Sequence, residues 1–506
     1  MKRNGQIFCA IIFMLVGSLV HAAGARQESN SRSTNLEFTC DSKLEMDTWQ
    51  LWDARGFWLA KNQLLEKRLL ASGDSYALYD FEASFHNLLN MAQRCRRLER
   101  QQQIEKLIET AYTALGALKE QPGRAWICRG GSICNNKNGL LGTEVVLNSA
   151  QFLALATDAA RGIEQNDFAG FSKNFREQTI SIALEHLTRW SNPSGLGELR
   201  KRIEATPADV KDGSSALFLM DSDIWQIAAY ANLAGILASR SQELKDTGLG
   251  EEQIILLKRH LSLLLRLVKT RITLQAGFAG EKSVTIADLD EGFRRLHADN
   301  RFAAYSGEEK PIDCARDGKV NGDDGKMLLQ NKIKKIQPVS NLGVDISHAR
   351  RLVHFFNAIE RNRDALNKIF QVSSPDLPSS EVAAAFAHQL RWKVWNQDES
   401  KPLFTNYFNG ANGWFRVGYN NGVGRCSEGY PPFALTNSFP TGGYIVWSTV
   451  EPILGKLGQQ IYILTQSDNK ANQAFVEKYY SGLRMSISGD AGVVEKLMFW
   501  PSLISH

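Results

Sequence analysis

The chain has 506 residues, of which 43% are apolar and 22% are charged, and its formal net charge is +5. These fractions exclude a disordered chain, a collagen-like repeat and a coiled-coil rod. The mean hydropathy of −0.27 excludes a polytopic membrane protein. The absence of long runs of like charge gives no reason to expect a nucleic-acid partner.

The first residues follow the three-part pattern of a secretory signal peptide. Two basic residues open the chain, residues 7–20 form an apolar run, and Ala22 ends a cleavage site of small residues. The run is shorter than the ~20 residues that a membrane-spanning helix needs, which favours cleavage over an uncleaved anchor. We expect residues 1–22 to be removed and 23–38 to form a flexible polar leader. The mature protein is then expected to have no membrane span and to be periplasmic or secreted.

Six cysteines remain outside the signal peptide, and an even number in an exported chain indicates disulfides. They are Cys40, Cys95, Cys128, Cys134, Cys314 and Cys426. The spacing leaves the pairing open. Cys128 with Cys134 would close a small turn-rich loop, and Cys40 with Cys95 would tie the N-terminal tail to a helix. A zinc site is not favoured because no Cys-x-x-Cys motif occurs.

Helical patterns dominate the mature chain, with apolar residues recurring every three or four positions. The clearest helices are expected at 143–161, 223–238 and 252–274. Further helices are expected at 43–71, 78–98, 101–120, 174–190, 285–296, 325–336, 345–369, 379–396, 443–466 and 471–484. Strand patterns are scarce and are clearest at 405–419 and 484–488.

We therefore expect a mainly α protein, with about a dozen helices in hairpin pairs and few short strands near the C-terminal third. Such helices pack either into an (α/α) toroid-like ring or into a generic multi-helix bundle, and the sequence leaves both open. No fixed repeat is visible, which disfavours a solenoid. One helical domain is expected over 39–506, with a loop insertion at about 297–344 that is rich in Gly, Asp and Lys.

The sharpest local motif lies in this insertion. It resembles the calcium loop of an EF-hand, and more closely the dockerin-like version that closes on Asp. The oxygen ligands would come from Asp313, Asp317, Lys319 (by its carbonyl), Asn321 and Asp324. Calcium is then the expected cofactor, and a helix is expected to begin near Met327. The alternative is an acidic solvated loop, because Ala315 at the third position offers no ligand oxygen.

Residues 406–447 are unusually rich in aromatic residues, glycine and asparagine, a composition typical of a functional loop. Flat rings that can stack on sugars are offered by Trp414, Phe415, Tyr419, Tyr430 and Tyr444. Asn412 and Arg416 offer hydrogen bonds suited to hydroxyls and carboxylates. Glu428 is a candidate general acid or base, and Tyr430 is the alternative. The opposite interpretation is that these aromatic residues plug the end of a helical barrel.

Residues 343–354 look like the beginning of a helix that brings a histidine and a carboxylate together. Asp345 or Ser347 is a candidate N-cap, and the spacing places Asp345 beside His348 and Arg351 on the first turn. A histidine held by a carboxylate can transfer protons. The alternative is structural, with Asp345 capping the helix and His348 packing at its start.

The paired helices, the secretory signal and the segments NGANGWFRVGY and PTGGYIVW resemble the (α/α) toroid class of exported carbohydrate-active proteins. This class includes polysaccharide lyases, six-hairpin glycosidases and uronyl epimerases. The resemblance implies a sugar cleft at one end of the ring. In a lyase of this class one group neutralises the uronate carboxylate, here Arg416 or Asn412. Another group abstracts the C5 proton, here His348 or Tyr430.

The sequence thus predicts an exported protein that acts on a polysaccharide or oligosaccharide, as a uronate-directed lyase or as a glycoside hydrolase. A hydrolase would need two carboxylates across the bond, and Glu428 with Asp345 is the expected pair. The alternative is a non-catalytic periplasmic binding or structural module stabilised by calcium. Serine hydrolases, nucleotide enzymes and zincins are disfavoured because their motifs are missing.

Overall fold

The computed structural model describes residues 37–119, 122–135, 139–165, 173–240, 249–279, 282–297, 300–316, 327–331, 336–419, 427–484 and 489–505. The predicted signal peptide and most of the predicted leader lie outside the described residues. Within these ranges the chain is mainly helical, with 14 α-helices of at least seven residues and three two-stranded hairpins. The predicted class is therefore confirmed.

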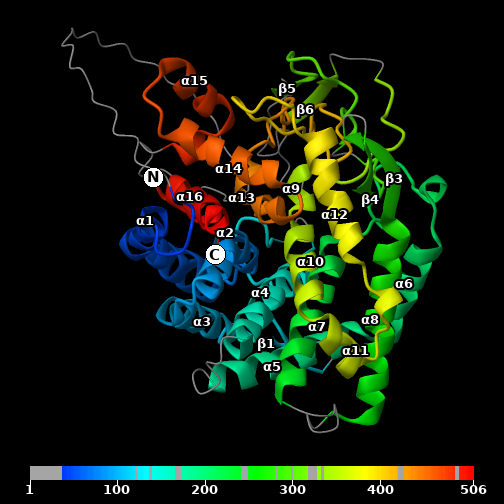
Figure 1. The fold of residues 1–506 in the computed structure, drawn as a ribbon. Helices are drawn as coiled ribbons and strands as arrows, with labels where there is room; N and C mark the ends of the chain where they lie inside the picture. The colour runs from blue at the N-terminus through cyan, green and yellow to red at the C-terminus, as the bar shows by residue number, and fades with distance from the viewer. Residues whose placement is uncertain are drawn as a thin grey trace.

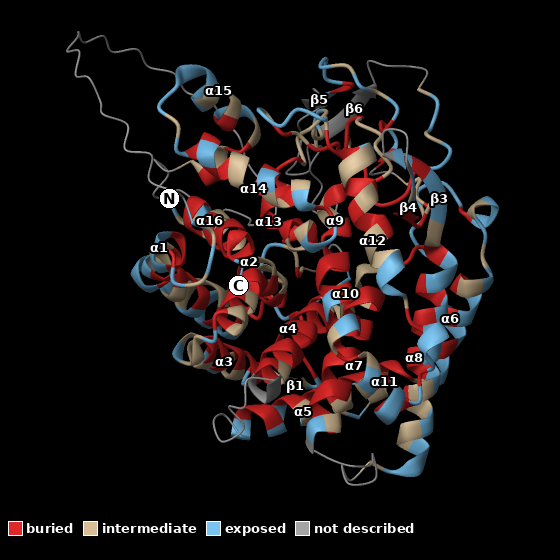
Figure 2. Ribbon diagram, viewed as in Figure 1, coloured by how far each residue is buried: buried red, intermediate tan, exposed pale blue. Residues whose placement is uncertain are grey.

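Five α-helices that pack in succession form the centre of the core. They are α2 (Tyr76–Arg94), α4 (Val146–Gln165), α7 (Asp221–Arg240), α10 (Arg351–Arg361) and α16 (Asp490–Leu503). Helix α4 packs between α2 and α7, α7 also packs on α10, and α2 also packs on α16 (Figure 1). Runs of buried alanines in α4 and α7 allow these two helices to approach closely. Most of the length of both helices is buried in Figure 2.

The remaining α-helices are α1 (Lys43–Leu51), α3 (Leu98–Tyr112), α5 (Lys173–Trp190), α6 (Pro193–Glu204), α8 (Glu251–Arg271), α9 (Ile346–Ala349), α11 (Arg363–Phe370), α12 (Ser380–Gln389), α13 (Ser438–Thr441), α14 (Pro452–Thr465) and α15 (Lys470–Tyr479). Four core helices pack on the helix that follows them, in the pairs α2–α3, α4–α5, α7–α8 and α10–α11. This sequential pairing is what the expected helical hairpins require.

Helical segments of two other kinds, π-helical and 3₁₀, connect or extend the α-helices. The π-helical segments are η1 (Trp52–Gly56), η2 (Leu59–Ala71) and η7 (Leu390–Val394). The 3₁₀ turns are η3 (Pro207–Asp209), η6 (Ser374–Asp376), η8 (Tyr444–Thr449) and η9 (Ser481–Leu483). The expected helix at 43–71 is confirmed as one continuous helical stretch, in which α1 runs directly into η1 and two α-helical residues join η1 to η2.

Three antiparallel hairpins replace parts of the expected helices. They pair β1 (Gly116–Ala117) with β2 (Arg124–Ala125), β3 (Ile272–Ala279) with β4 (Lys282–Leu289), and β5 (Ile312–Arg316) with β6 (Met327–Asn331). The helices predicted at 285–296 and 325–336 are therefore wrong where β4 and β6 occupy them. In β4, branched residues alternate across the strand and pair with β3, and this cross-strand pairing outweighs a helical pattern.

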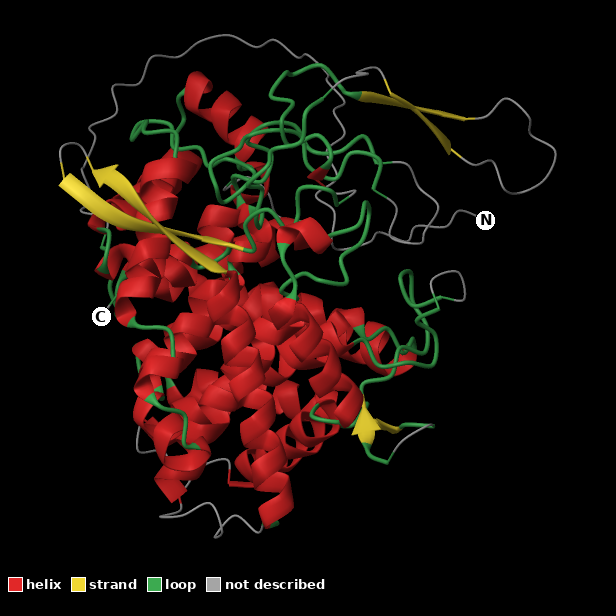
Figure 3. Cartoon of the chain, turned by 90° about the vertical axis from the view of Figure 1, so that its right-hand side faces the viewer, coloured by secondary structure: helices red, strands yellow, loops and turns green. Residues whose placement is uncertain are grey.

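The expected position of the strands is also wrong within the described ranges. All three hairpins end before the C-terminal third, since the last strand ends at Asn331. The segment 405–419 forms only isolated bridges, such as Asp345 with Tyr407 and Phe415 with Tyr430. The segment 485–488 lies outside the described residues. Loops gather at one end of the helical body, as Figure 3 shows.

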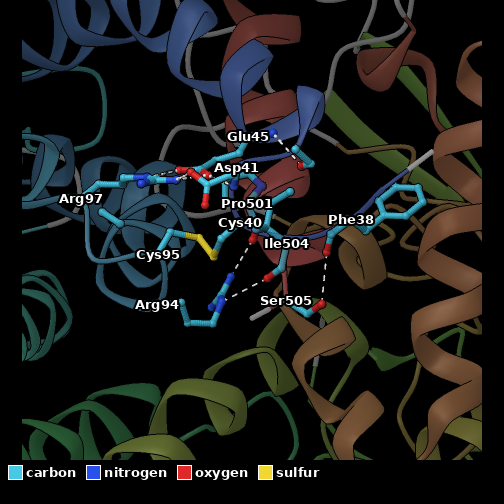
Figure 4. The surroundings of a disulfide bond; sticks show 12 residues. Phe38, Cys40, Asp41, Glu45, Arg94, Cys95, Arg97, Pro501, Ile504 and Ser505 are labelled. Carbon is cyan, nitrogen blue, oxygen red and sulfur yellow. Dashed lines mark hydrogen bonds and ion pairs between the residues drawn. A yellow bond between two sulfur atoms is a disulfide. The ribbon is translucent and has the colours of Figure 1, made fainter. Parts of the chain in front are cut away.

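Both predicted disulfide pairs are present, Cys40–Cys95 and Cys128–Cys134. Around the first pair, the two ends of the described chain lie side by side (Figure 4). The Ser505 amide donates to the Phe38 carbonyl at 2.8 Å. The Arg94 guanidinium, one residue before the disulfide, donates to the carbonyls of Pro501 and Ile504 at 2.7 and 3.1 Å. The helix α16 is thereby fastened to α2.

Disulfides are consistent with an oxidising, extracytoplasmic location. Cys426 and the side chain of Cys314 lie outside the described residues. Across the ranges that are described, no helix is both long enough and apolar enough to cross a membrane.

Candidate active site

Four core helices each direct a stripe of polar side chains toward the others. On α2 the stripe residues are three and four positions apart, and on α4, α7 and α10 they are spaced in similar helical steps, so each set shares one helix face. The stripes comprise Tyr79, Glu82 and His86 on α2, Gln151 and Asp158 on α4, Asp221, Trp225 and Asn232 on α7, and Arg351, His354 and Arg361 on α10. Hydrogen bonds, ion pairs and ring contacts connect the stripes to one another.

The inner part of this network centres on His86. Its Nδ1 lies 2.8 Å from Glu82 and its Nε2 lies 2.9 Å from Asp158, and all three side chains are buried. Arg350 lies 3.2 Å from Glu82, and Arg361 pairs with Asp158. Every ion of the cluster therefore has an opposite charge beside it.

These contacts set the protonation states of the cluster. Burial alone would raise the pKa of Glu82, but the charge of Arg350 and the hydrogen bond from His86 lower it to about 2. The pKa of Asp158 is also well below its usual range, because Arg361 and His86 outweigh burial. Burial opposes the charge of His86, yet the two carboxylates raise its pKa. The cluster thus favours an imidazolium between two carboxylates.

A second histidine lies directly against His86. The rings of His86 and His354 stack with centroids 3.7 Å apart, and burial and the charge of His86 hold the pKa of His354 well below its usual range. Glu82, His86 and His354 each offer a ligand atom, all within 4.8 Å of one another, so this group could hold a metal ion. Because His86 gives both nitrogens to carboxylates, a metal would have to replace its hydrogen bond to Glu82.

The motifs predicted from the sequence do not include this inner cluster. The only local signal is Glu82 four residues before His86, a spacing that places both on one helix face. Asp158 and His354 come from helices far along the chain, and nothing local connects them to His86. The cluster therefore emerges only from the packing of α2, α4 and α10.

The outer part of the network centres on His348 in α9. Asp345 caps this helix, since its Oδ1 accepts hydrogen bonds from the amides of Ser347 and His348 at 3.0 and 3.1 Å. Its Oδ2 lies 2.6 Å from His348 Nδ1. The structure thus brings Asp345 and His348 together, as their spacing indicates, and Asp345 serves both as helix cap and as partner of the imidazole.

The other ring nitrogen of His348 faces residues from two distant segments. Arg416 Nη2 lies 3.5 Å from His348 Nε2, and Asp221 Oδ2 lies 3.9 Å from it. The side chains of His348 and Asp221 are 19% and 15% exposed, so both are partly accessible to solvent. Arg416 has a φ of 54°, in the left-handed region that glycine prefers, and this strained backbone carries its guanidinium to the histidine.

Asp221 connects the outer and inner parts. It lies 3.1 Å from Arg351, whose guanidinium also donates to the Tyr79 hydroxyl at 3.0 Å. Burial opposes ionisation of Asp221, but the charges of Arg351 and His348 hold its pKa below the usual value. Burial likewise opposes ionisation of Asp345, and His348, Ser347 and Arg416 outweigh it, so its pKa is well below the usual range. Two carboxylates and two arginines therefore surround one partly exposed imidazole.

Three of the residues expected to contact sugar are held by internal hydrogen bonds. Trp414 is 3% exposed, and its indole donates to the Gly307 carbonyl at 2.6 Å. Tyr444 is fully buried, and its hydroxyl donates to the Ile346 carbonyl at 2.6 Å. Asn412 accepts from the Phe433 amide at 2.8 Å. In this arrangement, these side chains hold the loops together.

The remaining loop residues lie nearer the surface. Tyr419 is half-buried, with the Arg416 guanidinium 4.9 Å from its ring. Tyr430 is half-buried and its backbone pairs with that of Phe415, which itself lies beside His348. Glu428 is exposed and pairs with Lys310. The two carboxylates expected as a hydrolase pair thus have different neighbours. Glu428 contacts a surface lysine, whereas Asp345 contacts His348.

The expected calcium loop is mostly outside the described residues, including Asp317, Lys319, Asn321 and Asp324. Asp313 is exposed and belongs to β5, where it pairs with Gln330 of β6. The helix expected to begin near Met327 is wrong, since a strand occupies that position. Calcium binding remains a prediction.

Comparison of the chain with models of known protein families, with curated proteins and with solved structures finds no match. The residues around His348 and the order in which the helices pack are therefore the basis for a function.

Proposed function

We propose that this chain is an exported carbohydrate-active protein in which His348 transfers a proton on an anionic, uronate-type substrate. The observation that carries the proposal is the position of His348, with Asp345 2.6 Å from one ring nitrogen and Arg416 3.5 Å from the other. A carboxylate on one nitrogen fixes the tautomer that leaves a lone pair on the other.

The chemistry follows from these positions. Arg416 would bind the uronate carboxylate and make the neighbouring C5 proton more acidic. His348 Nε2 would take that proton, the C5–H electron pair would form the C4=C5 double bond, and the C4–O bond would break. The departing oxygen would take a proton from the imidazolium or from water. Asp345 would hold the ring and stabilise its charged form.

The packing order supports the toroid that this proposal assumes. Consecutive core helices pack in the order α16, α2, α4, α7 and α10, and each of the middle three pairs with the helix that follows it. A ring of helical hairpins would give this order. Helix α9, which carries His348, lies near the end where loops gather (Figures 1 and 3). In such folds, a substrate cleft is expected at that end.

The test is an assay of the purified, oxidised chain against acidic and neutral polysaccharides, following both new reducing ends and the absorbance of unsaturated uronates. We expect both signals from an acidic polymer. His348→Ala should lower kcat by about 10²- to 10⁴-fold, the usual contribution of a positioned acid or base. Arg416→Lys keeps the charge but loses the planar fork, and should raise KM more than it lowers kcat.

His388 provides a matched control because it is also a partly exposed histidine, 3.5 Å from Glu451. His388→Gln should leave the activity unchanged. Activity that survives His348→Ala would show that His348 is not the base. New ends without absorbance would indicate a hydrolase instead of a lyase. If neither signal appears on any polymer, the protein is better described as the non-catalytic helical module.

That second candidate is favoured by one observation. The ionisable residues around His348 already have partners within the protein, as Asp221 has in Arg351 and Asp345 has in His348. Paired charges also occur in purely structural networks. In that case His348→Ala should lower the free energy of unfolding and have no catalytic counterpart.

A further inference from the structure

A cavity of about 120 Å³ lies between the β3–β4 hairpin, the end of α12 and two loops, and neither His348 nor Asp345 is among its lining residues. It is larger than a single water, whose share of liquid volume is about 30 Å³. Its polar lining comes from Asp288 and Glu291 beside the hairpin, Gln389 at the end of α12, and Asn341 and Asn409 in the loops. Four separate segments of the chain thus converge on one small space.

Within the described part of the chain, two oxygen atoms of these lining residues have no hydrogen-bond partner. Asp288 is 6% exposed, its Oδ1 accepts from the Leu289 amide at 2.7 Å, and its Oδ2 is buried without a partner. Gln389 is 4% exposed, its amide nitrogen donates to the Phe408 carbonyl at 2.9 Å, and its Oε1 is buried without a partner. A buried acceptor left without a donor destabilises the folded protein.

Both unsatisfied atoms are acceptors when Asp288 is ionised, so a suitable ligand must bring hydrogen-bond donors. Glu291 adds a second carboxylate, which is held by Gln275 at 3.2 Å. Lys393 is exposed and is the basic side chain in the lining. With both acids ionised, these side chains together favour a cation over an anion or a neutral group.

We propose that this cavity binds the primary ammonium group of a small polar ligand, with Asp288 Oδ2 and Gln389 Oε1 as its acceptors. The ammonium supplies three donors and a positive charge, which match two unsatisfied acceptors and a surplus carboxylate. The amides of Asn341 and Asn409 would contact the polar remainder of the ligand. The cavity shares no residue with the site around His348, so ligand binding there can be tested independently of the proposed function.

The protonation of Asp288 gives the site a distinctive signature. Burial, assisted by the nearby charges of Glu291 and Asp290 and opposed by Arg294, raises the pKa of Asp288 to about 8. Without a cation the carboxyl is therefore largely protonated at neutral pH. Binding of an ammonium must release that proton, so the affinity should rise between about pH 6 and about pH 8.5.

The experiment is calorimetric titration of the purified full chain with ethanolamine, whose amine stays protonated over this range, and with ethylene glycol as the uncharged probe of similar size. Ethanolamine should bind and ethylene glycol should not. Asp288→Asn keeps the shape and removes the charge, and should weaken binding by about tenfold or more, the loss expected for a charge-assisted hydrogen bond. Lys393→Met removes the competing positive charge and should strengthen binding.

Asp288→Asn should fold normally, since the carboxyl it replaces is already largely neutral at pH 7, and its melting temperature provides the check. Equal binding of the two probes, or no binding of ethanolamine, would overturn the proposal and leave water as the partner of the two acceptors. Stabilisation by calcium that is lost in Asp288→Asn, with no effect of ethanolamine, would also overturn it and indicate a metal site. An affinity independent of pH would exclude Asp288 as the acceptor.

Discussion

His86 lies at the centre of a buried cluster of ion pairs. It lies between two buried carboxylates and beneath a second imidazole, with Glu82 at 2.8 Å and Asp158 at 2.9 Å. Each carboxylate also has an arginine, but removing the imidazolium would leave both with too little compensation in a region of low dielectric. Breaking a buried ion pair by removing one partner usually costs about 3–5 kcal/mol.

We therefore predict that His86→Gln lowers the free energy of unfolding by about 3–5 kcal/mol, measured by urea unfolding with tryptophan fluorescence. The cost depends on pH. The folded-state pKa of His86 is raised, so its stabilisation is full below the unfolded value of 6.5 and is lost as pH rises through the folded value. The difference between wild type and variant should shrink in alkaline solution.

The same cluster also determines how the stability of the folded protein changes at acidic pH. The folded-state pKa of Glu82 is about 2, below its ordinary value of 4.5, so its stabilisation is full above 4.5 and is lost as pH falls toward 2. His388→Gln, at a partly exposed position, should change stability by less than about 0.5 kcal/mol. A His86 variant as mild as this control would show that the cluster contributes little.

At the scale of residues, the sequence predicts what lies within one helical turn. Asp345 and His348 are three positions apart, so their contact is expected from the sequence. Arg416 is a candidate because its guanidinium can bind a carboxylate. Asp221 and Tyr79 complete the outer site from positions far earlier in the chain, and no local pattern connects them to His348. Burial also decides the roles of Trp414 and Tyr444, which composition alone cannot assign.

At the scale of elements, α9 shows how one side chain can serve structure and chemistry together. This helix has only four residues, so its amides depend on the cap that Asp345 supplies. The same carboxylate contacts the imidazole of His348, and its two oxygens divide these tasks. Oδ1 accepts from the backbone and Oδ2 from the ring.

Two substitutions should separate these tasks. Asp345→Ala removes both and should lower stability by about 1–2 kcal/mol, in the upper range for loss of an N-cap. Asp345→Asn keeps a capping oxygen and should cost less than half of that, but it removes the charge opposite His348. The measurements are urea unfolding and, where a substrate is found, the pH dependence of kcat. Equal stability losses in the two variants would contradict a capping role.

The elements also show where helical periodicity misleads. Residues 285–296 have a helical spacing of apolar side chains, yet the first of them belong to β4, because Ile272–Ala279 is available as a partner strand. A pattern that fits both periods is decided by the partner, which a window of local sequence does not contain. The long helices α2, α4, α7 and α8 lack this ambiguity, and their patterns predict them well.

At the scale of the whole molecule, the two disulfides have different tasks. Cys40–Cys95 spans 55 residues and fastens the beginning of the described chain to α2, next to the C-terminal segment. Cys128–Cys134 spans six residues and closes a local loop. The first therefore closes a much longer loop in the unfolded chain than the second.

We predict that Cys40→Ser with Cys95→Ser lowers the free energy of unfolding by about 4 kcal/mol, and Cys128→Ser with Cys134→Ser by about 2 kcal/mol, from the loop lengths in the chain-entropy model. Urea unfolding of both double variants, compared with the oxidised wild type, measures this difference. A larger loss of stability in the Cys128–Cys134 double variant would contradict the greater contribution expected from the Cys40–Cys95 disulfide.

The packing of α2 against α16 has a consequence for the order of events during synthesis. The N-terminal part of the chain leaves the ribosome first. Helix α2 therefore emerges long before α16, which covers one of its faces. That face stays bare until residue 503 has left the exit tunnel, and the nascent chain cannot complete its interior earlier. Completion of this interior therefore waits for a segment far along the chain, and contacts between such distant segments form late and slowly.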